Sequence, residues 1–488
     1  MTTNRSRPAD SWLQRDISRQ TFLRGAVGML ATGAVLGTAR AAADPVAGWG
    51  GLASSIGGSV VLPTNATQFS TSKKVFNSFY DNSSPAAVVT VSSQADVQKA
   101  VAFATANNLK VAPRGGGHSY VGASSANGTL VLDLRGLPGG ANFDGNNVTV
   151  TPATTLYAIH QALAGAGRAI PGGTCPTVGV AGLALGGGIG PDTRHAGLTC
   201  DALQSATFVL PSGDVVTASA NDNPDLFWAL RGGGGGNFGV TTSMTFSTFA
   251  TADSDVVRLD FPPASATQVL VGWQSWLSAA DRNTWGIVDL MVGSAPNCHV
   301  LATCPAGAGS GVVDAIKSAV GVAPTSVSNK SMNRTDLLMF LAGGSANPPA
   351  RSFVAGSDVI GPVDSAAAHA IATAIGQWPS GAGQASVLVD PLGGAAADVA
   401  AGDTAFPWRN QSAVLQWYVE PSSSQVSAAN SWLSSAHQAV QQISVGGYVN
   451  YLEANGAPAR YFGSNLSRLT TVRQKYDPNR VMFSGLNF

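Results

Sequence analysis

The chain has 488 residues, a formal net charge of zero and only 11% charged residues. This length predicts two or three domains, and the lack of a basic field excludes binding to nucleic acid or anionic lipid as the main function. Glycine supplies 58 residues, well above the usual share of roughly 7%. Apolar residues recur throughout, so these glycines are expected in loops of a globular protein.

The first 43 residues are typical of an export signal. Arg19 and Arg24 precede an uncharged run over 25–39, and the alanines at 41–43 offer a small-residue cleavage site. The segment resembles a twin-arginine signal with Gln20 in place of the second arginine. We therefore expect a secreted or periplasmic protein. A membrane anchor is the alternative, but an apolar run of about 15 residues is shorter than the ~20 needed to span a bilayer, so stable membrane insertion is not expected.

Residues 44–250 predict the first part of a mixed α+β domain. Ser93 can cap a helix over 93–107, whose apolar positions recur on one face. The flanking runs 88–91 and 110–113 read as strands, and the second leads into a glycine-rich loop. Further strands are predicted over 129–134, 148–151, 201–210, 214–217 and 240–246, with helices over 156–163 and 224–231.

The pattern changes from residue 251. Strand-like runs over 285–292 and 413–420 alternate with helices over 264–279, 311–320 and 364–377. Residues 251–425 therefore predict an inserted substrate domain, in which helices cover a sheet. Residues 426–488 are expected to return to the first domain through a helix.

Four cysteines are present. Cys298 and Cys304 flank a five-residue segment and can form a local disulfide in an oxidising compartment. Cys200 is expected to be a small buried hydrophobic residue. Cys175 lies among Gly, Thr and Pro on a loop, where a structural cysteine has little core to fill.

Two glycine-rich loops, about 57 residues apart, each carry a nucleophile: His118 in the first and Cys175 in the second. Glycine lets the backbone approach a flat or charged ligand closely, because it has no Cβ. The pair predicts a large cofactor that is held closely and tethered, although a histidine on such a loop is ordinarily a hydrogen-bonded polar residue. The run 234–239 matches G-x-G-x-x-G, but a helix-like segment precedes it and a β-branched run follows, which argues against a dinucleotide fold.

Six motifs occur together between about residue 77 and the C-terminus. They are Arg114-Gly115-Gly116-Gly117-His118-Ser119, Gly173-Thr174-Cys175-Pro176-Thr177-Val178-Gly179, Leu185-Gly186-Gly187-Gly188, the segment 228–239, Tyr448-Val449-Asn450-Tyr451, and the segment 461–479. In this order they resemble the FAD-linked oxidases of the vanillyl-alcohol oxidase superfamily, in particular the berberine-bridge-enzyme-like branch with bicovalent FAD. The resemblance is thin between about 260 and 400, where substrate is expected to bind.

The resemblance implies an α+β fold, with a two-subdomain FAD-binding domain of the vanillyl-alcohol oxidase type and an inserted antiparallel substrate sheet covered by helices. It implies that His118 bonds to the 8α carbon of the flavin and Cys175 to C6, since both are nucleophiles when deprotonated. Further cofactor contacts are expected from Arg114, Gly115, Gly116, Gly117, Ser119, Val178, Gly179, Gly187, Gly188, Gly239, Val240, Asn450 and Asn465.

Tyr451 is the predicted catalytic base, because it follows Asn450 at the position of the family's proposed base. A phenol titrates near 10, so a local cation or hydrogen-bond donors would have to assist its ionisation. An aromatic residue packed against the sheet is the alternative interpretation. Some members use a glutamate instead, at a position near Leu415 or Gln416, where this chain has no carboxylate. Gln416 and Tyr418 are candidate substrate contacts.

The implied reaction is oxidation of an alcohol, the anomeric hydroxyl of a sugar or oligosaccharide, by hydride transfer to flavin N5. Val178 resembles the valine of relatives that react with O2, so hydrogen peroxide is the expected product; no metal is expected. Tryptophans of the middle region are candidate stacking platforms for sugars: Trp273, Trp276, Trp285, Trp408 and Trp417. The alternatives are a tailoring oxidase or dehydrogenase of a polyketide, alkaloid or other secondary metabolite, and a flavin-carrying binding protein without redox activity.

Overall fold

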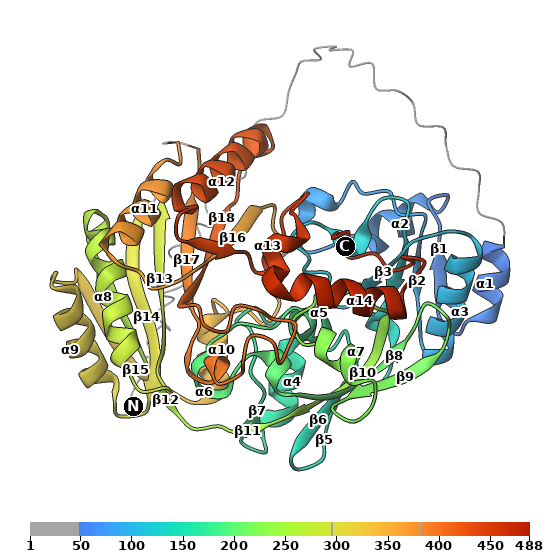
Figure 1. Ribbon diagram of the computed structural model, residues 1–488, viewed down its shortest axis with the longest axis horizontal. Helices are drawn as coiled ribbons and strands as arrows, with labels where there is room; N and C mark the ends of the chain where they lie inside the picture. Colours follow the sequence, from blue (N-terminus) through green and yellow to red (C-terminus); the bar gives the residue numbers. More distant parts are fainter. Residues whose placement is uncertain (1–47, 294–295, 380–381) are drawn as a thin grey trace, which may run out of the picture.

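The computed structural model describes residues 48–293, 296–379 and 382–488. Two lobes lie side by side (Figure 1). The glycine-loop lobe contains residues 48–250 and 447–488, and the large-sheet lobe contains the described residues between 251 and 446. The predicted export signal, residues 1–43, lies outside the described residues. No helix in the described ranges is long and apolar enough to cross a bilayer.

A four-stranded sheet at one end of the glycine-loop lobe positions the first glycine loop. Its strands, in spatial order, are β1 (Ser59–Val61), β2 (Ala87–Thr90), β4 (Leu130–Asp133) and β3 (Val111–Arg114). Helix α3 (Gln94–Ala106) begins where the Ser93 hydroxyl accepts a hydrogen bond from the Asp96 amide at 3.1 Å, a standard N-cap. The helices α1 (Trp49–Ser55) and α2 (Ala66–Ser72) complete this end.

A five-stranded antiparallel sheet forms the rest of the glycine-loop lobe. Its strands, in spatial order, are β5 (Ala141–Phe143), β6 (Asn147–Val150), β10 (Val240–Ser247), β8 (Leu203–Val209) and β9 (Val215–Ser219). The pair β7 (Arg168–Ala169) and β11 (Phe249–Ala250) lies beside it. The helices of this region are α4 (Leu156–Ala164), α5 (Val180–Leu185), α6 (Thr193–Ala196), α7 (Pro224–Ala229), α13 (Pro458–Phe462) and α14 (Leu466–Tyr476).

The second lobe is built on an eight-stranded sheet whose neighbouring strands are all antiparallel. Its strands, in spatial order, are β15 (Ser326–Met332), β12 (Ser254–Phe261), β14 (Asn297–Pro305), β13 (Trp285–Val292), β17 (Ala385–Pro391), β18 (Ala413–Val419), β16 (Val354–Ile360) and β19 (Ser444–Gly446). The α+β class and the helix-covered antiparallel sheet expected from the sequence are confirmed.

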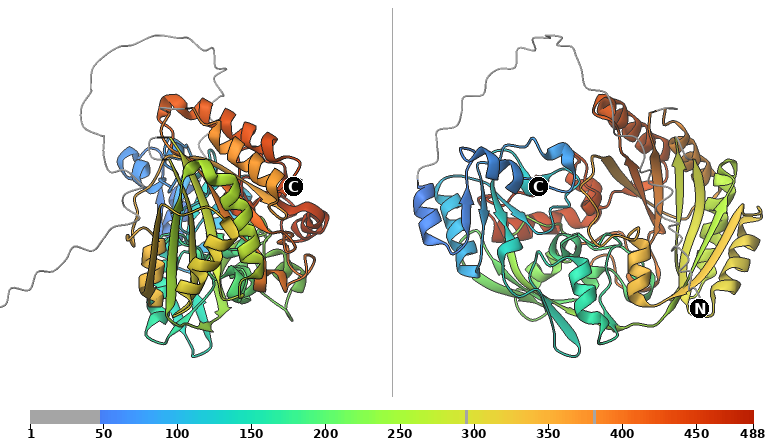
Figure 2. Two further views of the ribbon diagram at one scale, coloured as in Figure 1. Left: turned by 90° about the vertical axis from the view of Figure 1, so that its left-hand side faces the viewer. Right: turned by 180° about the vertical axis from the view of Figure 1, so that it is seen from behind.

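One face of this sheet is the core of the lobe. The helices α8 (Ala266–Ala279), α9 (Gly309–Val320), α11 (Ser365–Gly376) and α12 (Val426–Val440) form a layer over it, which Figure 2 shows from two further sides. Helix α10 (Arg334–Leu341) packs elsewhere, against α4. Because side chains alternate along a strand, Leu415 and Trp417 of β18 enter this core, while Gln416 and Tyr418 face the other lobe.

The structure answers a question that the sequence left open, whether Cys298 and Cys304 form a disulfide. Both are buried free thiols on the single strand β14. At about 3.3 Å per residue they are roughly 20 Å apart, and a disulfide needs Cα atoms within about 7 Å, so they are not bridged. Helix α12 and strand β19 pack with the large sheet. We therefore propose that the C-terminal domain boundary lies near residue 446 and not at residue 425.

Candidate active site

The two glycine loops touch each other. The first follows β3 and the second precedes α5, and their backbones meet where Gly116 lies against Gly179. A Cβ on Gly116 would lie 2.3 Å from the Gly179 nitrogen, and a Cβ on Gly179 would lie 2.3 Å from the Gly116 nitrogen. Only glycine fits at both positions. The tight crossing brings His118 and Cys175 into one cavity, although 56 residues separate them.

Thr177 lies between the two nucleophiles. Its Oγ1 shares a hydrogen bond of 3.0 Å with Nε2 of His118 and lies 3.7 Å from Sγ of Cys175. The imidazole also stacks on Phe76, with 4.1 Å between ring centroids. Burial lowers the pKa of His118 to about 4, so the ring is neutral at neutral pH. In the tautomer whose Nε2–H donates to the threonine, Nδ1 keeps its lone pair for a ligand in the cavity.

The cavity has a volume of about 660 Å³ and lies between the glycine loops and the open face of the large sheet. Its loop side is lined by Gly115, Gly116, Gly117, Gly234, Gly235 and Gly236, together with Gly179 and Gly239. Backbone amides at such glycines can approach a phosphate or a flat ring without a Cβ between them. The residues present therefore fit an extended dinucleotide cofactor with a planar ring.

Tyr451 and Asp390 face each other where this cavity meets the large sheet. Tyr451 ends the short 3₁₀ segment η8 (Val449–Tyr451), and Asp390 lies on β17. The Tyr451 hydroxyl donates a hydrogen bond of 3.4 Å to Oδ2 of Asp390. Tyr120 stacks on Tyr451, with 5.1 Å between ring centroids, and its hydroxyl accepts a hydrogen bond from Nε2 of Gln416.

Burial dominates the electrostatics of this pair. Desolvation raises the pKa of Asp390 to about 7, and the hydrogen bond from Tyr451 opposes the shift. Desolvation also raises the pKa of Tyr451 well above its ordinary value, and the negative charge of Asp390 adds to this effect. The sequence predicts a local cation or hydrogen-bond donors beside the phenol, but its hydroxyl meets a carboxyl group instead. A carboxyl group with a pKa near neutrality is suited to accept a proton at physiological pH.

Most of the residues predicted from the sequence line the cavity. They are Gly115, Gly116, Gly117, His118, Ser119, Cys175, Val178, Gly179, Gly239, Gln416, Tyr418, Asn450 and Tyr451. The Tyr418 hydroxyl donates to Glu420 at 2.9 Å, and Glu420 in turn pairs with Arg351 at 2.7 Å. Leu415, near the position of the family's glutamate, is buried on the opposite face of the sheet.

Two polar side chains predicted to contact the cofactor, those of Arg114 and Asn465, point into the protein interior. Arg114 is 1% exposed and pairs with Asp133 at 2.7 Å. Asn465 donates to the carbonyl groups of Ala401 and Thr404. Neither residue lines the cavity. Their side chains satisfy buried partners of the fold, and their contacts with the cofactor remain predictions.

Three further predicted contacts also lie off the cavity wall. Gly187 and Gly188 follow α5, and a Cβ on Gly188 would lie 2.2 Å from Oγ1 of Thr199. These glycines permit close packing of the loop, and the Gly188 amide donates to the Tyr448 hydroxyl at 2.8 Å. Val240, on β10, is fully buried and packs with the core of the four-stranded sheet. Cofactor contacts from these three residues remain predictions.

The tryptophans considered as sugar platforms are mostly core residues. Trp273 and Trp417 are at most 1% exposed, and Trp276 and Trp408 are also buried. Of the five, Trp285 alone lines the described cavity. The stacking surface near Tyr451 is instead provided by Tyr120.

Sequence reasoning missed Asp390, Thr177 and Tyr120 as site residues. Asp390 lies within the apolar strand β17, and aspartate is depleted in strands. An aspartate in an apolar strand is a local signal, but it does not identify Tyr451, 61 residues away, as the partner of Asp390. Thr177 and Tyr120 lie within or next to the glycine-loop motifs, but a hydroxyl or phenol on a loop carries no local signal of which side chain it will contact.

Comparisons with known proteins agree with this geometry. The family described as "FAD binding domain" matches residues 85–219, and the family described as "Berberine and berberine like" matches residues 447–483. The uncharacterized FAD-linked oxidoreductase YgaK of Bacillus subtilis is 30% identical over 81% of this chain and 89% of its own length. Chitooligosaccharide oxidase of Gibberella zeae is 28% identical over 81% of this chain and 86% of its own.

Solved structures show the same fold. BBE-like 1 of Physcomitrella patens superposes with a TM-score of 0.82 and 26% identity, over 89% of this chain and 97% of its own. Glucooligosaccharide oxidase of Acremonium strictum, which carries 6-S-cysteinyl, 8α-N1-histidyl FAD, gives a TM-score of 0.78 and 25% identity, over 84% of this chain and 92% of its own. This chain is therefore an FAD-binding oxidoreductase and belongs to the berberine-bridge-enzyme-like FAD-linked oxidases of the vanillyl-alcohol oxidase family.

Proposed function

We propose that this protein is an exported oxidase that tethers FAD through His118 and Cys175 and oxidises the anomeric hydroxyl of a sugar or oligosaccharide. Dioxygen is the electron acceptor and hydrogen peroxide the product. The observation that carries the proposal is the hydrogen-bonded pair of Tyr451 and Asp390, in the same cavity as both nucleophiles. When bound, FAD supplies the hydride acceptor.

The proposed tethers follow from the surroundings of the two nucleophiles. His118 is neutral and stacked in place, and its hydrogen bond to Thr177 occupies Nε2. When Nε2–H donates to the threonine, Nδ1 is the nitrogen available to bond the cofactor. The Cys175 thiol lies on the other side of the same threonine. The histidine and cysteine links of the Acremonium strictum enzyme support this arrangement.

The protein's own contribution to the chemistry is proton transfer. The Tyr451 oxygen is the proposed acceptor of the substrate hydroxyl proton, while the phenolic proton moves to Oδ2 of Asp390. The transfer requires Asp390 as a carboxylate, which is its main form above about pH 7. Tyr451 thus acts as the base expected from the sequence, with Asp390 as the final proton acceptor.

Hydroxyl-rich substrates suit the polar end of the cavity. Gln416, Tyr418, Glu420 and Arg351 line it beside Asp390 and can exchange hydrogen bonds with several hydroxyl groups. The oxidases of chitooligosaccharides and xylooligosaccharides among the relatives support a carbohydrate. Val178 also lines the cavity, and its modest size supports access by dioxygen.

A second candidate is a tailoring oxidase of a less polar metabolite. Ile287, Leu301 and Leu388 form an apolar stretch of the cavity wall between Asp390 and the far strands of the sheet. Such a wall fits an aromatic or aliphatic ring as well as a sugar face. The distinction depends on which alcohol is turned over.

A substrate panel coupled to peroxide detection tests these proposals on purified holoenzyme. Mono- and oligosaccharides with free reducing ends form one arm, and benzylic and polycyclic alcohols form the other. Peroxide and an aldonic product in the sugar arm are expected. Turnover confined to the second arm would favour the tailoring oxidase, and no turnover in either arm would favour a flavin-carrying binding protein. The Tyr451→Phe variant serves as the chemically impaired control.

A further inference from the structure

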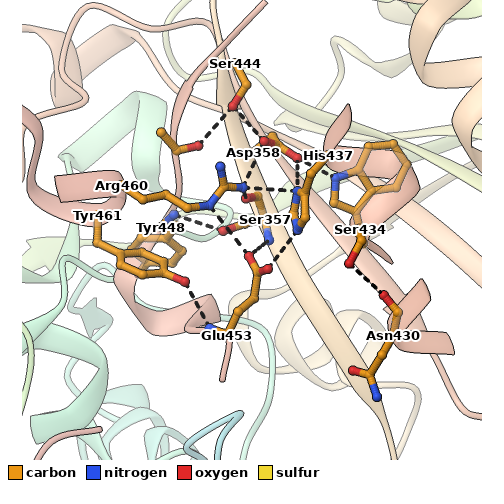
Figure 3. Close-up of polar contacts among 12 residues, drawn as sticks. Ser357, Asp358, Asn430, Ser434, His437, Ser444, Tyr448, Glu453, Arg460 and Tyr461 are labelled. Atoms are coloured by element: carbon orange, nitrogen blue, oxygen red, sulfur yellow. Dashed lines mark hydrogen bonds and ion pairs between the residues drawn. The ribbon is translucent and has the colours of Figure 1, made fainter. Parts of the chain in front are cut away.

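A partly buried cluster of four charged residues joins the two lobes next to the Tyr451 segment (Figure 3). Asp358 comes from β16 and His437 from α12 of the large-sheet lobe. Glu453 lies just after η8, and Arg460 lies on α13 of the glycine-loop lobe. None of these residues lines the cavity, and the proposed proton transfer does not use them.

His437 is held between two carboxylates. Its Nδ1 lies 2.6 Å from Oδ2 of Asp358, and its Nε2 lies 2.8 Å from Oε2 of Glu453. A ring with a carboxylate at each nitrogen satisfies both only when both nitrogens carry hydrogen, which is the charged form. Asp358 and Glu453 outweigh the cost of burial and raise the pKa of His437 to about 9.

The other groups that face His437 complete a neutral set of charges. Arg460 donates to Oδ1 of Asp358 at 2.9 Å and to the Ser357 carbonyl at 2.6 Å, and its Nη2 lies 3.1 Å from Nδ1 of His437. Asp358 is fully buried and also accepts hydrogen bonds from Ser444 and Trp417. Two cations and two carboxylates therefore balance in a site largely removed from water, where an unpaired charge would be costly.

The cluster fixes both ends of the segment that carries Tyr451. At one end the Tyr448 amide donates to Oγ of Ser357 at 2.9 Å. At the other end Glu453, two residues after Tyr451, accepts from the Ser357 amide at 3.3 Å and from His437. Its carboxyl group lies against Gly356, where a Cβ would be 2.5 Å from Cδ of Glu453. The segment is thus attached to β16, which lies two strands from Asp390 on β17.

We propose that protonated His437 acts as a positioning residue: by joining Glu453 to Asp358, it holds the Tyr451 segment against the large sheet, so that the Tyr451 hydroxyl meets Asp390. Loss of this proton removes one of the two hydrogen bonds and leaves a partly buried net negative charge. The segment then loosens from the sheet. The catalytic consequence rests on the proposed role of Tyr451, but the loosening itself does not.

The sign of the pH effect follows from proton linkage. The pKa of His437 lies above its ordinary value of 6.5, so its stabilising contribution is complete below about pH 6.5 and is lost as the pH rises through about 9. Asp358 keeps its charge throughout, because His437 and Arg460 outweigh burial and hold its pKa below the usual value. Loosening is therefore expected on the alkaline side.

Hydrogen exchange of the FAD-loaded protein tests this without any substrate. The peptide that covers residues 447–455 should exchange about tenfold faster in His437→Gln than in the wild type at pH 7, after correction for intrinsic rates. In the wild type, exchange of this peptide should rise between pH 8 and pH 10, and the variant should lack this rise. His369→Gln on the exposed side of α11 is the matched control and should behave as the wild type.

A second variant keeps the test decisive if His437→Gln does not fold. Glu453→Gln preserves the shape and removes one carboxylate, so the alkaline rise should begin about one pH unit lower.

With an active substrate, His437→Gln should lower the rate of flavin reduction at saturation more than it changes KM. Unchanged exchange in the peptide, in either variant and across the pH range, would overturn the proposal. If exchange responds but flavin reduction does not, the role of Tyr451 is at fault and the role of His437 as a clamp stands.

Discussion

The phenol of Tyr451 and the carboxyl group of Asp390 share a hydrogen bond of 3.4 Å across the boundary between the two lobes. Asp390→Asn keeps the size of the side chain and removes the proton acceptor. We expect the rate of flavin reduction to fall by about 10²-fold or more, the usual contribution of a positioned base. Stopped-flow absorbance measures this rate. Asp398→Asn, at an exposed carboxylate, is the control, and an equal loss there would point to a general effect on folding.

The pH dependence of turnover should follow Asp390. Its pKa is raised to about 7 by burial, and the carboxylate is the form that accepts the proton. We therefore expect kcat/KM to decline as the pH falls below about 7, by tenfold for each further unit. Asp390→Asn should lack this acidic limb over the range in which the protein stays folded. A wild-type limb centred near pH 4 would show that another group controls the reaction.

Replacing Tyr451 by phenylalanine should also slow flavin reduction by about 10²-fold or more. The stacking of this ring on Tyr120 is retained in phenylalanine, so folding and cofactor binding should be preserved. The absorbance spectrum of the bound flavin and the thermal midpoint check this. A near-normal reduction rate would move the role of base to Asp390 alone.

Covalent attachment should depend on Thr177 as well as on the two nucleophiles. The intact wild-type chain should carry the mass of one FAD, and its yellow colour should stay with acid-precipitated protein. The double variant with His118→Ala and Cys175→Ala should release the colour. Thr177→Val keeps the shape but removes the hydrogen bond to His118, so the histidine-linked fraction should fall. Thr174→Val, on the same loop, is the control. Full histidine linkage in Thr177→Val would show that stacking on Phe76 alone orients the ring.

The number of free thiols in the unfolded protein distinguishes a cofactor link at Cys175 from a disulfide between Cys298 and Cys304. The chain has four cysteines, and the link to FAD would remove Cys175, so 4 − 1 = 3 thiols should react after unfolding without reductant. Cys298 and Cys304 should both be among them, because they lie far apart on β14. Peptide mapping after alkylation measures this. A count of one would indicate the bridge that the structure excludes.

Arg114 should matter for stability more than for the cofactor. Arg114→Met removes a buried pair with Asp133 at 2.7 Å, but Arg135 still pairs with that carboxylate at 2.6 Å. The variant should therefore lower the free energy of unfolding by less than the about 3–5 kcal/mol that is typical when a buried charge is left unpaired. Chemical denaturation of the holoprotein measures it. If the variant keeps normal stability but no longer retains FAD, the cofactor contact predicted for Arg114 would be supported.

Much of the local structure could be read from the sequence. The cap at Ser93 and the apolar face of α3 predicted that helix, and the strand-like runs over 285–292 and 413–420 predicted β13 and β18 with nearly their observed bounds. The order of the glycine motifs indicated the family and the cofactor. Each helix, strand and single motif depends on neighbours within a few residues, which is the range over which backbone preferences and periodicity act.

The pairing of distant residues was decided by the tertiary structure alone. Asp390 reaches Tyr451 because β17 lies inside the large sheet and η8 crosses between the lobes. His437 is charged only because Asp358 and Glu453 arrive from separate segments. No local pattern encodes such contacts, since they arise from strand order and from burial. For the same reason, two cysteines that look like bridge partners in the sequence are kept apart by one straight strand.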